Sequence, residues 1–254
     1  MNRDYGNREL DGMAAIVTGS AKNMGRMIAR TLAHAGASVL INAKTSRDAA
    51  ESVVEEITSD GGQAFVHMAD VTQPDAVDGM VAAAVDKFGR LDILVNNVGL
   101  RLAKPVTEVS FDEWRTVQSA LDAAFLCTKA VVPHLAKQGC GSIVNIGGVS
   151  GHAGVANRSP VAAAKAGLAG FTGSLGVELA PLNITVNCIA PGHIAHEGED
   201  GRVSEHFRER AIPMGHSGRP EDIADMVRFL CGPSGHYTTG ETIHVNGGWY
   251  VAIA

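Results

Sequence analysis

The peptide RSPVAAAKAG, residues 158–167, contains a single lysine among alanines. Pro160 suits the first turn of an α-helix and the alanines favour its continuation, so we expect Lys165 to lie on a helix. Residues four apart share one face of a helix, but the residue four positions before Lys165 is Val161, which has no polar group. A partner for Lys165 therefore has to come from another part of the fold or from a ligand.

A second group of residues suited to chemistry is TGSAKNMG, residues 18–25, which lies between an apolar run and a predicted helix. A strand, a glycine-rich turn and a helix N-terminus bind phosphate, because backbone N–H groups and the helix dipole face the anion. Asn23 stands where a glycine is common, and asparagine tolerates the left-handed backbone well. The alternative is an ordinary β–α turn. We expect a dinucleotide to contact Thr18, Gly19, Ser20, Asn23, Met24 and Gly25.

The end of the second apolar run bears on the choice between NAD(H) and NADP(H). An NAD site usually places a carboxylate about 20 residues after the glycine turn, where it binds the ribose hydroxyls. Here Ala43 occupies the expected acidic position, and Lys44, Thr45, Ser46 and Arg47 follow it. Two cations and no anion suit a 2′-phosphate, so we predict NADP(H) in preference to NAD(H). The alternative is a solvated loop whose charges contact nothing.

Short apolar runs alternate with amphipathic stretches along the chain. Most runs are nearly continuous, as strands of a parallel sheet covered on both faces require. This alternation predicts a doubly wound α/β domain with a parallel sheet of about seven strands. The predicted strands are 13–18, 37–42, 63–68, 91–96, 142–147, 184–190 and 242–247, and the predicted helices are 23–36, 46–60, 74–89, 110–137, 160–180 and 220–231.

Composition narrows the classes of function. The chain of 254 residues has a net charge of −6 and no run of lysine or arginine, so nucleic acid and membranes are poor candidates as partners. Its four cysteines are scattered without metal-binding spacing, so we expect reduced thiols and no metal site. We expect a polar tail over residues 1–11 and a single domain over 12–254. The absence of an apolar leader or span predicts a cytoplasmic protein.

The motifs, taken in order, resemble the short-chain dehydrogenase/reductase family, and most of all its 3-oxoacyl-carrier-protein reductase branch. The resemblance extends from Gly12 to Gly248. It implies a Rossmann-like domain that acts on a small carbonyl or alcohol substrate and assembles as a homotetramer or homodimer. The resemblance depends on TGSAKNMG at 18–25, NNVG at 96–99, AAAKAG at 162–167, ELAP at 178–181, VNCIAPG at 186–192, GRPEDIA at 218–224 and TTGETIHVNGG at 238–248.

Further cofactor contacts are implied by this resemblance. Asp70 and Val71 match the pair that touches adenine, and Lys165 matches the lysine that binds the nicotinamide ribose. A binding role of this kind is enough to explain a lysine on an alanine-rich helix. The other matched cofactor positions are Asn96, Asn97 and Gly99 in the NNVG motif, and Pro191, Gly192 and Ile194 at the turn beneath the nicotinamide.

The residues that perform the family's chemistry are replaced. The family has a tyrosine four residues before the lysine, a serine thirteen before the tyrosine and an asparagine twenty-eight before the serine. These positions are Val161, Gly148 and Ala120 here, and none can exchange a proton. Loss of a general acid costs about 10²–10⁴ in rate, and loss of an oxyanion donor about 10²–10³. We therefore expect carbonyl reduction by the usual route to be very slow.

Other side chains lie near the reaction centre in the family register. Ser150, His152 and His193 are candidates for carbonyl polarisation or proton transfer, since histidine is the natural substitute acid at neutral pH. For each candidate the alternative is a structural role, and Ser159 is expected to cap its helix. We expect the loop 193–217 to determine the substrate. The residues expected to face the substrate are Arg101, Arg158 and His196, the last at a position where the family usually has a threonine.

Three functions remain open on the sequence. The first is an NADP(H)-dependent oxidoreductase whose proton donor is His193 or His152, with Ser150 polarising the carbonyl group. The second is a non-redox enzyme on the same scaffold, such as a lyase, isomerase or cyclase, since a fold does not fix a reaction. The third is a nucleotide-binding protein without turnover. The nearly complete set of predicted nucleotide-binding residues favours the oxidoreductase.

Overall fold

A seven-stranded parallel sheet forms the centre of the computed structural model, which describes residues 8–195 and 211–252. The strand order is β3-β2-β1-β4-β5-β6-β7, which confirms the predicted doubly wound class. The order reverses between β1 and β4, the kind of switch point at which such folds bind ligands. The strands are β1 (Ala14–Val17), β2 (Ser38–Ala43), β3 (Gln63–Met68), β4 (Ile93–Asn96), β5 (Gly141–Ile146), β6 (Ile184–Pro191) and β7 (Thr242–Val245).

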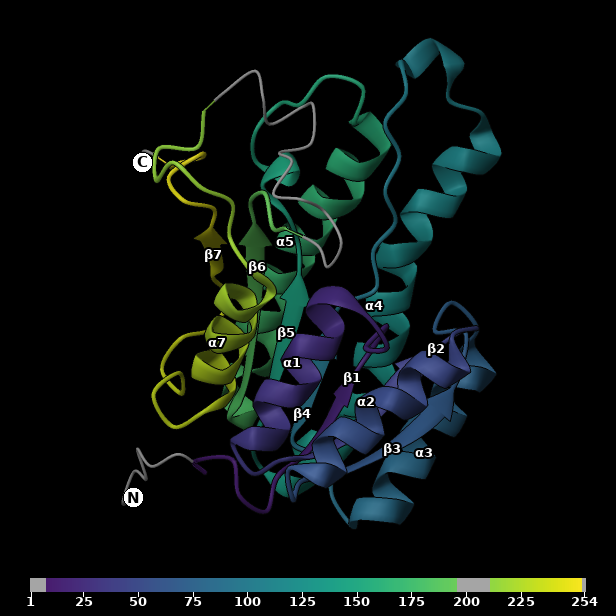
Figure 1. Ribbon diagram of the computed structural model, residues 1–254, viewed down its shortest axis with the longest axis vertical. Coiled ribbons are helices and arrows are strands. Elements are labelled where there is room, and N and C mark those ends of the chain that lie inside the picture. Colours follow the sequence, from purple (N-terminus) through teal and green to yellow (C-terminus); the bar gives the residue numbers. More distant parts are fainter. Residues whose placement is uncertain (1–7, 196–210, 253–254) are drawn as a thin grey trace.

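Helices cover both faces of this sheet (Figure 1). One apolar core joins the sheet to α1, α2 and α7, and a second joins it to α3, α4 and the end of α5. Among the described helices, none has the length and apolar character that crossing a bilayer requires. The helices are α1 (Asn23–His34), α2 (Arg47–Ser59), α3 (Pro74–Phe88), α4 (Phe111–Gln138), α5 (Ser159–Leu179) and α7 (Pro220–Cys231), with short 3-10 turns η1 (Val106–Glu108), η2 (Val149–Gly151) and η3 (Ala180–Leu182).

The two cores explain why the strands are continuously apolar. In β1, Ala15 and Val17 pack into one core and Ile16 into the other, and all three are fully buried. Successive side chains of a strand point to opposite faces, so in a sheet covered on both sides the side chains on both faces are buried. Complete burial of a valine or isoleucine side chain, such as Val17 or Ile16, stabilises the fold by about 1.5–3 kcal/mol.

All the predicted strands and helices are present, with small shifts at their ends. One cap was predicted incorrectly: α5 begins at Ser159 itself, and Arg158 is its N-cap residue, without a side-chain hydrogen bond. The folded core begins earlier than residue 12, because Leu10 is fully buried and Glu9 forms a 2.6 Å ion pair with Arg228. Residues 196–210 of the expected substrate loop, including His196, lie outside the described residues.

Candidate functional site

The glycine turn between β1 and α1 has the backbone that a phosphate cradle needs. Gly19 has φ +60° and Asn23 has φ +51°, which confirms the left-handed conformation expected for Asn23. A Cβ on Gly25 would collide with the Gly19 carbonyl oxygen, so only glycine fits there. The first turn of α1 contains no acidic residue and its N-cap forms no side-chain hydrogen bond. The turn therefore fits the pyrophosphate of a dinucleotide, with backbone N–H groups at a helix N-terminus.

Side chains from neighbouring strands hold this turn in place. The Asn97 amide donates hydrogen bonds to the carbonyl oxygens of Thr18 at 3.0 Å and Gly19 at 3.1 Å. Asn42 accepts a 3.1 Å hydrogen bond from the Gly19 N–H group. The sequence reading missed Asn42, although a polar residue inside a buried strand was a usable signal, because buried amides need partners.

The loop after β2 carries the charges expected to select the cofactor. Lys44 forms a 2.8 Å ion pair with Asp70, the residue matched to the adenine contact. This hydrogen bond from Lys44 is the main cause of a lowered Asp70 pKa, and a second hydrogen bond from Thr72 adds to it. Arg47 is exposed and pairs with Glu51 at 3.3 Å. Lys22, another exposed cation, lies on the phosphate turn itself, and the sequence reading overlooked it.

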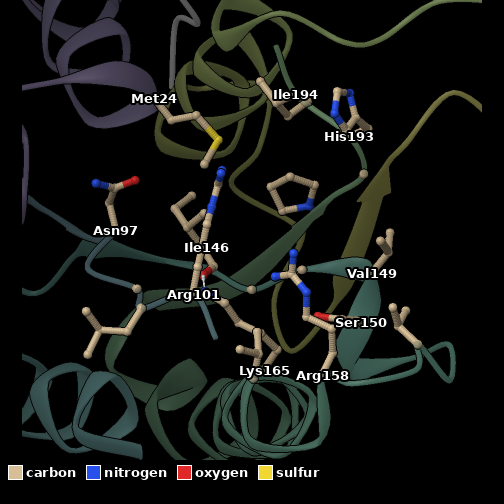
Figure 2. A pocket seen from close by; sticks show the side chains of 18 residues that line it. Met24, Asn97, Arg101, Ile146, Val149, Ser150, Arg158, Lys165, His193 and Ile194 are labelled. Carbon is tan, nitrogen blue, oxygen red and sulfur yellow. Dashed lines mark hydrogen bonds between the residues drawn. The ribbon is translucent and has the colours of Figure 1, made fainter. Parts of the chain in front are cut away.

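A cavity of about 210 Å³ lies beyond the glycine turn, at the carboxyl ends of β4, β5 and β6 (Figure 2). It brings together most of the predicted nicotinamide, catalytic and substrate residues. The sequence reading did not identify Leu100, Ile146, Gly147, Val149 and Val155 as part of its wall. The predicted residues that line the cavity are Met24, Asn97, Gly99, Arg101, Gly148, Ser150, Arg158, Val161, Lys165, Pro191, Gly192, His193 and Ile194.

Lys165 lies on the floor of this cavity, where its ammonium group donates a 2.8 Å hydrogen bond to the Ile146 carbonyl oxygen. Burial lowers the pKa of Lys165 to about 8, and the positive charge of Arg101 acts in the same direction. A Cβ on Gly99 would lie 3.1 Å from the Lys165 Nζ, so glycine there keeps the approach to the ammonium group open. Lys165 is therefore still mainly protonated at physiological pH, and it can be reached from the cavity.

The side chains of Ala120, Gly148 and Val161 provide no proton donor. Val161 lines the cavity at 5% exposure and packs against Val117 and Ala164. Ala120 is buried on α4 and is not part of the cavity wall. A Cβ on Gly148 would lie 3.6 Å from Lys165 Cγ and 3.8 Å from Ser150 Oγ. The Ser150 hydroxyl therefore lies close to the space that a side chain at position 148 would occupy.

The two candidate histidines differ in their surroundings. His193 lines the cavity at 7% exposure, and its Nδ1 lies 2.9 Å from the Ser217 hydroxyl. His152 is outside the cavity wall and packs edge-on against His244, with 4.7 Å between ring centroids. Burial lowers the pKa of both His152 and His244. The geometry thus favours His193 over His152 as a group that reaches a substrate.

A buried amide network supports the cavity from below. The Asn96 amide donates to Asn145 Oδ1 at 2.9 Å and to Thr128 Oγ1 at 3.2 Å, and the Asn145 amide donates to Thr172 Oγ1 at 2.9 Å. These bonds connect β4 and β5 to α4 and α5, the helices that carry Ala120 and Val161. Apart from Asn96 these residues were not identified from the sequence, because their pairing depends on strand register.

Comparisons with known proteins agree with this geometry. The profile of the enoyl-(acyl carrier protein) reductase family matches residues 19–250. The chain is 39% identical over 241 residues to a 3-oxoacyl-[acyl-carrier-protein] reductase of Synechocystis sp., covering 94% of this chain and 97% of that protein. The chain therefore belongs to the short-chain dehydrogenase/reductase family of oxidoreductases.

Solved structures show the same fold. A blue fluorescent protein from a metagenomic library, in complex with NADPH, has a TM-score of 0.88 and 33% identity, covering 96% of this chain and all of that one (100%). A 7α-hydroxysteroid dehydrogenase in complex with NADH and 7-oxo glycochenodeoxycholic acid has a TM-score of 0.89 and 33% identity, covering 95% and 96%. The fold thus occurs with either nicotinamide cofactor.

Proposed function

We propose that this chain is an oxidoreductase that binds NADP(H) in preference to NAD(H) and interconverts a carbonyl compound and its alcohol, with His193 as the proton-transfer group. The observation that carries the proposal is the composition of one cavity wall. Lys165, Ser150 and His193 line it together, whereas Val161 and Gly148 leave it without the family's hydroxyl groups. The proposal assigns proton donation and hydrogen bonding to these three polar groups.

The preference for NADP(H) rests on charge, because the fold itself occurs with both cofactors. β1 and β2 are parallel neighbours, so the phosphate turn after β1 and the loop after β2 share one edge of the sheet. Exposed Lys22, Lys44 and Arg47 gather there. The ion pair of Lys44 with Asp70 competes only weakly with a bound phosphate. The Lys44 side chain is 67% exposed, and exposed ion pairs contribute only about 0–1 kcal/mol to stability. The Lys44 ammonium can therefore turn to a 2′-phosphate at little cost.

In the proposed mechanism, the side chains in the cavity have separate roles in hydrogen bonding and proton transfer. A nicotinamide bound here would supply a hydride to the carbonyl carbon, or accept one from the alcohol carbon in the reverse reaction. The carbonyl oxygen takes the C=O electron pair and needs one proton. The Ser150 hydroxyl and the Lys165 ammonium group donate hydrogen bonds to this oxygen, and His193 delivers the proton. In the alcohol direction the proton returns to His193, whose ring orientation is set by Ser217 at 2.9 Å.

Single-turnover kinetics with NADPH and a panel of carbonyl compounds test the proton donor. His193→Gln should slow the hydride-transfer step by about 10²–10⁴, the usual contribution of a general acid, with NADPH affinity unchanged. His152→Gln is the matched control, because His152 is a half-buried histidine outside the cavity wall. Equal rates for the parent protein and a folded His193→Gln variant would refute the proposed relay.

Fluorescence titration tests the cofactor preference. The parent protein should bind NADPH more tightly than NADH. The double variant Lys44→Ala and Arg47→Ala should lose about 10–150-fold in NADPH affinity, the equivalent of one hydrogen bond to a charged group, and keep its NADH affinity. Lys87→Ala, an exposed lysine in the last turn of α3, is the control. Tighter binding of NADH by the parent protein would contradict the proposal.

A further inference from the structure

Lys165 reaches the cavity with few polar contacts of its own. Its ammonium group donates a 2.8 Å hydrogen bond to the Ile146 carbonyl oxygen, and among the described residues no carboxylate forms an ion pair with it. Figure 2 shows the side chain rising from α5 towards Ile146. The residue one turn earlier on α5 is Val161, which has no hydrogen-bonding side chain. Within the described part of the chain, the amino nitrogen is therefore held by a backbone contact and has no counter-ion.

Two glycines keep the lysine side chain open to the cavity. A Cβ on Gly99 would lie 3.1 Å from the Lys165 Nζ, and a Cβ on Gly148 would lie 3.6 Å from the Lys165 Cγ. All three residues line the cavity, where the lysine side chain is half-buried. A small molecule in the cavity can therefore approach the amino nitrogen past Gly99 and Gly148 without displacing a side chain.

The surroundings of Lys165 favour the neutral form of its amine. Apolar side chains form much of the cavity wall, among them Met24, Val149, Val155 and Val161. Burial is the main cause that lowers the pKa of Lys165 from 10.5 to about 8. At about pH 7.5 this shift gives about 10²-fold more free amine than an ordinary lysine has. Desolvation of a lysine in an apolar pocket makes its amine a better nucleophile.

We propose that Lys165 is also a nucleophile, which forms an imine with small, largely apolar aldehydes and ketones when no nucleotide occupies the cavity. The neutral amine attacks the carbonyl carbon, a C–N bond forms, and the carbonyl oxygen leaves as water with the two amine hydrogens. The protonated imine withdraws electrons from the neighbouring carbon, whose C–H proton passes to solvent and is replaced from it. This activity goes beyond the proposed oxidoreductase and is independent of it, because no nicotinamide is consumed.

Reductive trapping tests whether the imine forms at Lys165. The full chain, without added nucleotide, is incubated with 2-butanone and sodium cyanoborohydride, which converts an imine to a stable secondary amine. Peptide mapping by mass spectrometry then locates the modified lysines. Lys165 should be modified at least about tenfold faster than Lys129, an exposed lysine on α4, because more of its amine is neutral. Modification spread evenly over the lysines, or absent from Lys165, would overturn the proposal.

Hydrogen exchange provides a readout that needs no reductant. In D₂O the full chain should accelerate the replacement of the α-hydrogens of 2-butanone by deuterium, measured by NMR. Lys165→Arg keeps the positive charge but forms no imine, so it should lose this acceleration, whereas Lys129→Arg, the matched control, should retain it.

Equal exchange by the parent protein and a folded Lys165→Arg variant would overturn the proposal. If the variant does not fold, the location of the trapped adduct in the parent protein decides the question. A Lys165 adduct without NADPH-dependent carbonyl reduction would support the imine and contradict the proposed oxidoreductase. Reduction by NADPH without a Lys165 adduct would overturn the imine and leave the oxidoreductase standing.

Discussion

Val161→Tyr would place a phenol on the helix turn before Lys165 and test whether the lack of a hydroxyl group there limits ordinary ketone reduction. Residues 161 and 165 share one face of α5, and Val161 already lines the cavity. A larger ring directed at Val117 would cost about 1–3 kcal/mol in overpacking, whereas a ring directed into the cavity of about 210 Å³ would cost less. Gly148→Ser completes the pair, because a Cβ there would have an ordinary 3.6 Å contact with Lys165 Cγ.

The magnitude follows from the role of a general acid. Val161→Tyr in the Gly148→Ser background should reduce a neutral ketone such as ethyl acetoacetate about 10²–10⁴ faster than Val161→Phe in the same background, a difference of about 2.7–5.4 kcal/mol in activation free energy. The phenylalanine variant matches the ring volume and lacks only the hydroxyl group. The serine and tyrosine effects will not be additive, since such groups act as a unit.

The assay is NADPH oxidation in a single turnover at saturating cofactor, preceded by thermal unfolding and NADPH titration of each variant. Equal rates for the tyrosine and phenylalanine variants, both folded and both binding NADPH, would refute the reasoning. So would a parent protein that already reduces the neutral ketone as fast as the tyrosine variant.

Three further predictions concern binding, stability and pH. Gly25→Ala should abolish NADPH binding in a titration, because its Cβ would collide with the carbonyl oxygen of the preceding turn, while Gly79→Ala, with nothing within 4 Å of its Cβ, should bind normally. Burial lowers the pKa of His152 and His244 below 6.5, so the unfolded chain binds more protons as the pH falls through 6.5. Denaturant unfolding should therefore show decreasing stability below about pH 6.5, with a shallower decrease in His152→Gln. A pKa of about 8 means that Lys165 loses its charge above that pH. Single-turnover reduction should consequently slow above pH 8, and Lys165→Arg should shift this decline to higher pH.

The fold could be predicted from the sequence because its signals are local. Continuous apolar runs such as Ala14–Val17 require a sheet covered on both faces, and glycines follow within two residues of the ends of β1, β5, β6 and β7. The dependence on local signals also explains the wrong prediction of Ser159 as the N-cap of α5. Local preference placed a serine at the N-cap, but the left-handed Asn157 sets the path of the chain into α5. Tertiary context overrode a side-chain propensity there.

The site was only partly predictable. Family spacing placed Lys165, Ser150 and His193 at the cavity, because their distances from matched motifs are fixed along the chain. Spacing also suggested His152, whose ring instead packs against His244 from β7. That contact joins segments far apart in sequence, so no local pattern reveals it. The Asn145 network was missed for the same reason, since its partners meet only when the strands are in register.

Val161 and Gly148 bring no hydroxyl group to the cavity wall that Lys165 and Arg101 also line. In the proposed mechanism the Lys165 charge therefore acts on the reacting oxygen and not on a phenol. The positive charge of Arg101 adds to the potential at that position, as its effect on the Lys165 pKa indicates. An oxyanion that forms beside these cations is stabilised by charge, which acts strongly in a partly buried site. Arg101→Gln should therefore lower the rate of hydride transfer in single-turnover kinetics and leave NADPH affinity unchanged.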